Sequence, residues 1–199
     1  MNINELNINE MLKSSFKTLK EMLNDRNIDT TYLDKISEEE IIKLYEENQI
    51  FDFKVNDTLK IMYYMNTKIK INDIRKYIST VNDANTSIIF ISKEKFTTNN
   101  YKSFNDFKDF NIIITFFHLK ELLINIYNHN LVPKHIPITD KEEINKIMEM
   151  YSIKSKFQFP IILNTDPISK YLDIKSDTLV KIIRPSKTSG EYVLYRYCI

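Results

Sequence analysis

The sequence predicts a mixed α/β and α+β chain of two domains, divided into residues 1–128 and 129–199. Helical periodicity and short apolar runs of strand length are mixed through the first part. Two prolines in HNLVPKHIP, which starts at residue 129, indicate an extended connection between the parts. Two strand-like runs separated by SKTSG close the second part, so the smaller domain is expected to end in a β-hairpin.

The first part begins with a predicted amphipathic helix over residues 5–26, where apolar residues recur at helical spacing. A second helix is expected at Ser37, which forms an S-x-x-E capping box with Glu40. FDFKV at 51–55 alternates with a period of two, and a turn separates it from LKIMYYM at 59–65. These two stretches predict a hairpin.

Two buried strands and a helix are predicted for the remainder of the first part. Asn72 is expected to cap a helix that ends near residue 81. SIIFI at 87–91 and NIIITFF at 111–117 are apolar runs too short to span a bilayer, so we interpret them as strands.

The second part alternates capping signals with apolar runs. Thr139 and Glu142 repeat the T-x-x-E pattern and predict a helix start. FQFPIIL at 157–163 resembles a strand, and Asp166-Pro167 places an N-cap residue before a proline at the first position of a short helix. Strands are expected in TLVKIIRP and EYVLYRYCI.

Gly190 is the one glycine among 199 residues. The chain is poor in Gly, Pro and Arg and rich in Lys, Asn and Ile, which is typical of an A+T-rich genome, so a retained glycine is informative. We expect it to occupy a backbone position with φ > 0, at the end of the hairpin loop Thr188-Ser189-Gly190. There it would set the register of both strands.

Composition and charge indicate an ordinary soluble globular chain. It has 43% hydrophobic residues, 28% charged residues and a net charge of +1, so no global basic field points to nucleic acid. Cys198 is the single cysteine, which excludes an internal disulfide and favours a reducing compartment. The first residues lack the apolar region of a signal peptide, and no membrane partner is expected.

Few residues are candidates for catalysis. His118, His129 and His135 share no metal-ligand spacing, so neither a metal nor another cofactor is expected. A chain with one glycine has no nucleophile elbow and no phosphate-binding loop. One enzymatic alternative remains, a metal-dependent nuclease, because D-x-K occurs twice, at Asp52 to Lys54 and at Asp106 to Lys108.

Two of the four arginines lie in the final hairpin, with Lys181 and Lys187 nearby. These are Arg184 and Arg196, and the planar fork of arginine suits bidentate contacts to carboxylate or phosphate. The same residues also fit a solvated strand face, or a docking surface for a larger protein.

Several ordered stretches resemble the fifth subunit of eukaryotic multisubunit RNA polymerases, which has a shorter archaeal counterpart. The match is densest in HNLVPKHIPIT (129–139), DPISKYLDIK (166–175) and VKIIRPSKTSGEYVLYRY (180–197). It continues more weakly through FKTLKEMLNDRN (16–27), SIIFI and ELLINIYNH (121–129). Because the archaeal counterpart consists of the second part only, the chain resembles the eukaryotic form.

The resemblance implies a non-catalytic subunit of DNA-directed RNA polymerase that acts in transcription. Its first domain would be a jaw with a nuclease-like fold that lies along downstream double-stranded DNA. Its second domain would be an assembly module that packs against the largest subunit, among other polymerase subunits. The interface residues that it implies are His129, Pro133, Lys134, His135, Asp166, Pro167, Lys181, Arg184, Ser186, Thr188, Gly190 and Arg196.

The jaw of this family presents a T-P-S-A loop to DNA after the strand matched here by SIIFI. Thr97, Thr98, Asn99 and Asn100 stand in that place, and only the first threonine agrees. These small polar residues and the following Lys102 still suit contacts to backbone phosphates without base reading.

The family also has glycines where this chain has Asp173 and Asp177. Aspartate tolerates left-handed conformations better than most residues, so we expect both turns to be kept. Such departures fit a fast-diverging lineage, either a large DNA virus or an A+T-rich protist. The location would be a viral factory and the virion in the first case, and the nucleus in the second. A stand-alone adaptor protein is a further alternative.

Overall fold

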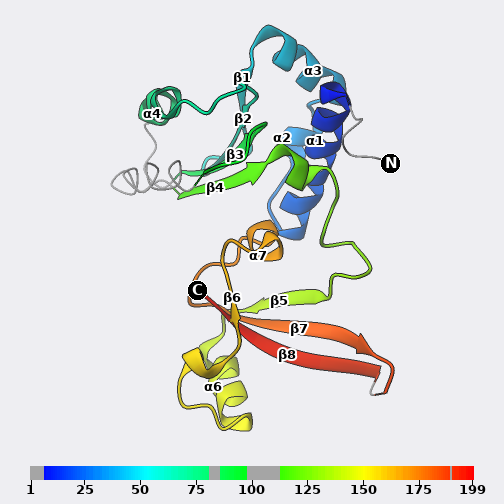
Figure 1. Ribbon diagram of the computed structural model, residues 1–199, viewed down its shortest axis with the longest axis vertical. Coiled ribbons are helices and arrows are strands. Elements are labelled where there is room, and N and C mark those ends of the chain that lie inside the picture. The colour runs from blue at the N-terminus through cyan, green and yellow to red at the C-terminus, as the bar shows by residue number, and fades with distance from the viewer. Residues whose placement is uncertain (1–6, 81–85, 98–112, 189) are drawn as a thin grey trace. The chain divides into compact units, whose positions relative to one another are not determined.

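The computed structural model of the chain describes residues 7–80, 86–97, 113–188 and 190–199 (Figure 1). The chain divides into two compact units, Met1–Ile124 and Asn125–Ile199. We call them the amino-terminal and the carboxy-terminal unit. Each contains helices and its own four-stranded sheet, so the predicted mixed α/β class is confirmed.

The sheet of the amino-terminal unit has the order β1-β2-β3-β4. The first two strands form the predicted antiparallel hairpin, whereas β2, β3 and β4 run parallel. Its elements are α1 (Ile8–Asp25), α2 (Thr31–Asp34), α3 (Glu38–Glu47), β1 (Ile50–Lys54), β2 (Leu59–Tyr64), α4 (Ile71–Thr80), β3 (Ser87–Ser92), β4 (Ile113–His118) and the 3₁₀ helix η3 (Leu119–Leu122).

Helix α4 is the crossover that the parallel pairing of β2 with β3 requires. The predicted cap at Asn72 is wrong, because the helix begins one residue earlier. The amide of Ile74 already donates to the carbonyl of Lys70 at 3.4 Å, which is a helical i to i−4 bond. Asn72 therefore lies inside the first turn.

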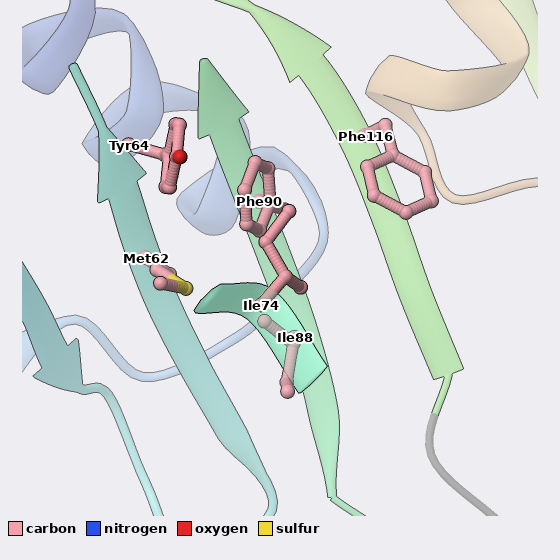
Figure 2. Packing of buried hydrophobic residues seen from close by; sticks show 6 residues of the cluster. All are labelled: Met62, Tyr64, Ile74, Ile88, Phe90 and Phe116. Carbon is pink, nitrogen blue, oxygen red and sulfur yellow. The ribbon is translucent and has the colours of Figure 1, made fainter. Parts of the chain in front are cut away.

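Helices cover both faces of this sheet, and strand alternation decides which side chains meet them. Met62 and Tyr64 of β2 join Ile74 of α4 in a buried cluster with Ile88, Phe90 and Phe116 (Figure 2). The intervening Tyr63 faces α1, where its hydroxyl lies 3.3 Å from that of Ser15.

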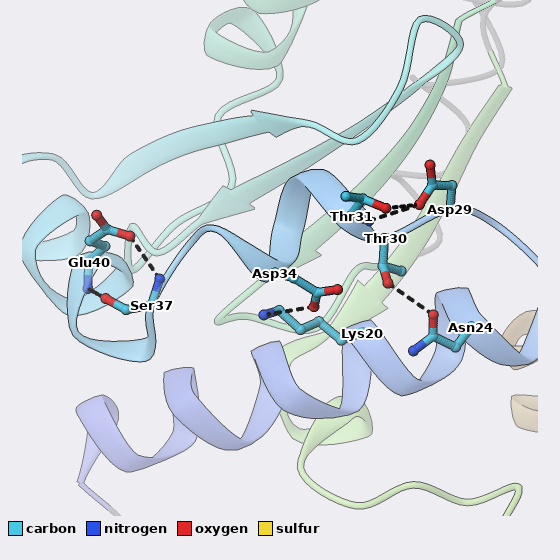
Figure 3. A network of polar contacts seen from close by, with 8 residues as sticks. All are labelled: Lys20, Asn24, Asp29, Thr30, Thr31, Asp34, Ser37 and Glu40. Carbon is cyan, nitrogen blue, oxygen red and sulfur yellow. Dashed lines mark hydrogen bonds and ion pairs between the residues drawn. The ribbon is translucent and has the colours of Figure 1, made fainter.

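The connections between α1, α2 and α3 are held by short-range polar contacts (Figure 3). The capping box predicted at Ser37 is confirmed, because the Glu40 amide donates to Ser37 Oγ at 3.2 Å and the Ser37 amide donates to Glu40 Oε2 at 2.8 Å. Lys20 of α1 pairs with Asp34 of α2 at 3.4 Å. Helix α2 was not predicted, because four residues are too few to show a helical period.

The carboxy-terminal unit contains a sheet of order β5-β7-β8-β6, with α6 and α7 on opposite faces (Figure 1). Strand β7 is antiparallel to β5 and β8, and β6 is parallel to β8. The elements are β5 (Lys134–Ile138), α6 (Lys141–Met150), the 3₁₀ helix η4 (Lys156–Gln158), β6 (Ile161–Ile162), α7 (Pro167–Tyr171), β7 (Leu179–Ser186) and β8 (Gly190–Cys198).

Three sequence predictions for this unit need correction. The cap of α6 is Asp140 rather than Thr139, since Asp140 Oδ1 accepts from the Glu142 amide at 3.0 Å and a carboxylate suits the positive end of a helix. FQFPIIL is not one strand, because it contains the end of η4 and the two-residue β6, separated by Phe159 and Pro160. The HNLVPKHIP segment was expected only as an extended connection, yet it contains β5, an edge strand that tolerates Pro137.

The final hairpin forms as predicted. Gly190 has φ of +74°, and it pairs with Ser186 at the closed end of β7 and β8. Asp173 and Asp177 also have positive φ, at 53° and 71°. The left-handed turns expected at the two aspartates are therefore kept without glycine.

Candidate docking pocket of the carboxy-terminal unit

Several residues that were predicted for a subunit interface line one cavity of about 360 Å³, although they are far apart in sequence. The remaining walls are aliphatic. The predicted residues among them are Pro133, His135, Asp166, Pro167, Arg184 and Arg196. We call this cavity the docking pocket.

Strand register brings the basic side chains together. His135 of β5 lies opposite Ile182 of β7, and Arg196 of β8 lies opposite Val180 of β7. Directly paired residues and alternate residues along a strand share a face. His135, Arg184 and Arg196 therefore project from the same face of the sheet, away from α6.

Helix α7 supplies an acidic group to the pocket. Asp166 is its N-cap, and the side chain accepts a hydrogen bond from the Ile168 amide at 3.0 Å, with Pro167 at the first helical position as predicted. This bond fixes the Asp166 carboxylate at the wall of the pocket.

His135 is a neutral group in this arrangement. It is only 8% exposed, and burial lowers the pKa of the ring below its usual value, with further lowering by Arg184 and Arg196. The Pro133 carbonyl and Asp166 act in the opposite direction but do not reverse the shift. Since Nδ1 lies 2.7 Å from the Pro133 carbonyl oxygen, it carries the proton of the neutral ring.

The two arginines keep hydrogen-bond donors available. Arg196 donates from Nη1 to the carbonyl of Ile161 at 3.4 Å, but its buried Nε has no partner among the described residues. Arg184 is exposed, and it forms no hydrogen bond or ion pair within the described part of the chain. The enclosed Nε has no surface for an outside acceptor, so a contact to a partner would use the other terminal nitrogen of Arg196, Nη2, together with the guanidinium of Arg184.

Other residues predicted for the interface lie elsewhere in the unit. Lys181 lies on the opposite face of β7 from Arg184, and His129 and Lys134 are exposed outside the pocket. Ser186, Thr188 and Gly190 lie at the closed end of the hairpin, where the hydroxyl oxygens of Ser186 and Thr188 are 3.2 Å apart. Sequence reasoning missed the aliphatic wall because its members have the ordinary pattern of core residues: Ile126, Val132, Ile162, Ile168 and Ile182.

The residues predicted in the amino-terminal unit for DNA binding, or for a nuclease site, do not gather into one site within the described residues. Thr97 is exposed after β3, whereas Thr98, Asn99, Asn100, Lys102, Asp106 and Lys108 lie outside the described residues. Asp52 accepts a hydrogen bond from the Tyr77 hydroxyl at 2.8 Å, and Lys54 pairs with Asp57 at 2.8 Å. Across the described ranges, no three His, Cys, Asp or Glu side chains gather as ligands for a metal ion.

None of the helices within the described residues combines the length and the apolar character needed to cross a bilayer.

Comparison with known proteins decides the family. Residues 124–198 match the family described as RNA polymerase Rpb5, C-terminal domain, and this stretch contains every residue of the docking pocket. The chain is 34% identical to the subunit rpabc1 of DNA-directed RNA polymerases I, II and III from Dictyostelium discoideum, over 96% of this chain and 98% of that protein. The chain belongs to the Rpb5 family. Subunits RPABC1 of the same polymerases from Caenorhabditis briggsae and Caenorhabditis elegans are 31% and 30% identical over 72% of this chain and 67% of their own length.

The predicted resemblance to the fifth polymerase subunit is thus confirmed. As a member of the Rpb5 family, the chain is a non-catalytic subunit of DNA-directed RNA polymerase that acts in transcription. The free-standing nuclease built on Asp52 or Asp106 is not the function of an Rpb5 subunit.

Protonation of His135 should destabilise the carboxy-terminal unit of this Rpb5 subunit. Because the pKa is lower in the folded state, the unfolded chain binds the proton first, and stability falls as pH drops below about 6.5 towards the folded pKa. We expect amide exchange in β7 to quicken between about pH 7 and pH 5 beyond the intrinsic pH effect. In His135→Gln this additional acceleration of exchange should be smaller. If the acceleration is the same in the variant, the titration of other groups causes it.

Proposed function

We propose that the carboxy-terminal unit docks this chain on the largest subunit of its polymerase, through the sheet face that carries the docking pocket. The observation that supports this most is that His135, Arg184 and Arg196 project from that face together. The two arginines have N–H donors that no acceptor of the described residues satisfies. Protein interfaces combine apolar contacts with direct hydrogen bonds, and this pocket offers groups for both.

The distribution of exposed apolar side chains supports the same unit as the docking module. Within the described residues, eight large hydrophobic side chains of this unit are at least 42% exposed. Exposed apolar side chains mark a protein interaction site where they join into one patch, and this unit has more of them than the amino-terminal unit among the described residues. In this unit they are Leu131, Met150, Tyr151, Phe157, Ile161, Leu163, Tyr192 and Ile199.

Purification of the tagged full chain from its native source tests the docking proposal. We expect two very large polymerase subunits to accompany it. Arg184→Ala should weaken this co-purification at nearly unchanged melting temperature, because the side chain is exposed and has no hydrogen bond or ion pair within the described residues. Lys181→Ala is the matched control, since it removes a cation from the opposite face of the same strand. Equal losses in the two variants, or unfolding of Arg184→Ala, would contradict the proposed face.

We further propose that the amino-terminal unit lies along downstream double-stranded DNA. By the resemblance, Thr97 would stand at the start of the segment that approaches DNA, and Thr97 is exposed five residues after the end of β3. Small polar residues and one lysine suit phosphate contacts that carry no sequence information.

Lys102→Ala should weaken DNA binding by the assembled enzyme modestly and equally across sequences. Loss of one phosphate contact lowers the slope of log affinity against log salt by about 0.9. Binding titrations at several salt concentrations measure this slope, with Lys181→Ala as the control. A sequence-dependent loss would contradict a contact limited to phosphates.

The proposal requires no cofactor and no membrane. It places the chain in the nucleus of a cellular host, or in the viral factory and the virion if a large DNA virus encodes it. Other polymerase subunits are expected partners beside the largest one.

A further inference from the structure

We propose that the docking pocket binds a single carboxylate, carried by a glutamate or aspartate side chain that the partner polypeptide inserts between Arg184 and Arg196. This inference rests on the proposed docking function and specifies the chemistry of its central contact. It follows from three properties of the pocket: its donors, its charge and its walls.

The donors are guanidinium groups on two neighbouring strands. Arg184 lies on β7 and Arg196 on β8, and both line the cavity. Arg196 uses Nη1 for the Ile161 carbonyl and its Nε is enclosed, so Nη2 is the nitrogen left for an external acceptor within the described part of the chain. Guanidinium forks match the geometry of a carboxylate, and charge-assisted bonds of this kind are about twice as strong as neutral ones.

The charge of the pocket favours a monoanion. Two arginines bring two positive charges, the Asp166 carboxylate cancels one of them, and neutral His135 adds none. One carboxylate would balance the remaining charge. A phosphate monoester with a charge near −2 would leave the pocket negative and would also face the fixed Asp166 carboxylate.

The walls favour a side chain with an aliphatic stem. The cavity is lined by Val132, Ile162, Ile168 and Ile182, in addition to the polar groups. Methylene groups of glutamate can pack against these walls while the carboxylate reaches the arginines. A sugar-phosphate backbone offers no comparable apolar surface, so the pocket fits an acidic peptide better than a nucleic acid.

Arginine side-chain NMR of the full chain tests the pocket directly. The chain has four arginines, so it should give four Nε–Hε resonances: Arg26, Arg75, Arg184 and Arg196. We expect N-acetyl-glutamate N′-methylamide to shift the resonances of Arg184 and Arg196 saturably at millimolar concentrations. The glutamine counterpart is the neutral probe of matched shape and should leave them unchanged, and Arg26 and Arg75 serve as internal references.

Three results would overturn the carboxylate site. They are equal shifts with both probes, no saturable shift with the glutamate probe, and tighter binding of inorganic phosphate than of that probe. Saturable, glutamate-specific shifts at Arg184 and Arg196 would support it.

Assembly with the polymerase supplies the second readout. Arg196→Gln should reduce co-purification of the largest subunit at least about tenfold, because a buried carboxylate would lose its partner. Arg196→Lys should lie between this variant and the unaltered chain, since lysine keeps the charge but lacks the fork. If Arg196→Gln does not fold, Arg184→Gln replaces it, because Arg184 is exposed.

The two readouts separate this inference from the docking proposal. If the unaltered chain brings the large subunits and Arg196→Gln does so equally well, the carboxylate contact is wrong and docking stands. If the unaltered chain brings no large subunit, docking itself is wrong, and the NMR titration alone decides the pocket.

Discussion

Replacement of Phe90 by alanine should lower the free energy of unfolding of the amino-terminal unit by about 3–5 kcal/mol. Phe90 is 1% exposed in the middle of β3, where its ring lies 5.8 Å from that of Tyr64 and 5.7 Å from that of Phe116 (Figure 2). The substitution removes apolar area and leaves a cavity between two parallel strands and α4, which the surrounding residues can fill only in part.

Urea titration followed by NMR signals from each unit measures this loss. Phe157→Ala is the matched control, because this phenylalanine is 73% exposed and its removal should change stability far less. Since Phe90 lies outside the carboxy-terminal unit, through which we propose docking, co-purification with the largest subunit should persist. Loss of the carboxy-terminal signals at the same urea concentration would show that the two units unfold as one.

Gly190→Val should destabilise the carboxy-terminal unit by about 1–3 kcal/mol through backbone strain. At φ of +74° a β-branched residue is strongly disfavoured, yet a Cβ built at this position meets no atom within 4 Å. The cost therefore comes from the backbone conformation rather than from a steric clash with neighbouring residues.

A series at this position separates strain from packing. Gly190→Asn should cost least, because asparagine tolerates the left-handed region, and Gly190→Ala should lie between Asn and Val. Thermal melting of the full chain, followed by signals from β7 and β8, gives the order. If valine also causes a register slip, side chains exchange faces and assembly with the polymerase should fall further than the melting temperature indicates. A silent valine variant would contradict the strained turn.

Local features of this protein were determined by the sequence itself. The capping box of Ser37 and Glu40, the Asp166-Pro167 helix start and the turn at Gly190 all formed as predicted. Each depends on contacts within a few residues, so the pattern of residue types contains the necessary information. Where two neighbouring residues could cap the same helix, as at Thr139 and Asp140 after the end of β5, the S/T-x-x-E pattern predicted the wrong one.

Only the tertiary structure decided what those local elements form together. The sequence showed apolar runs at β2, β3 and β4, but apolar runs do not reveal that the three strands are parallel. The docking pocket depends on two strand registers, one that sets His135 beside Ile182 and another that sets Arg196 beside Val180. A shift of either register by one residue would send its basic side chain to the face covered by α6, because side chains alternate along a strand. Long-range pairing, which no short stretch encodes, therefore turned the separate basic residues of the sequence into one site.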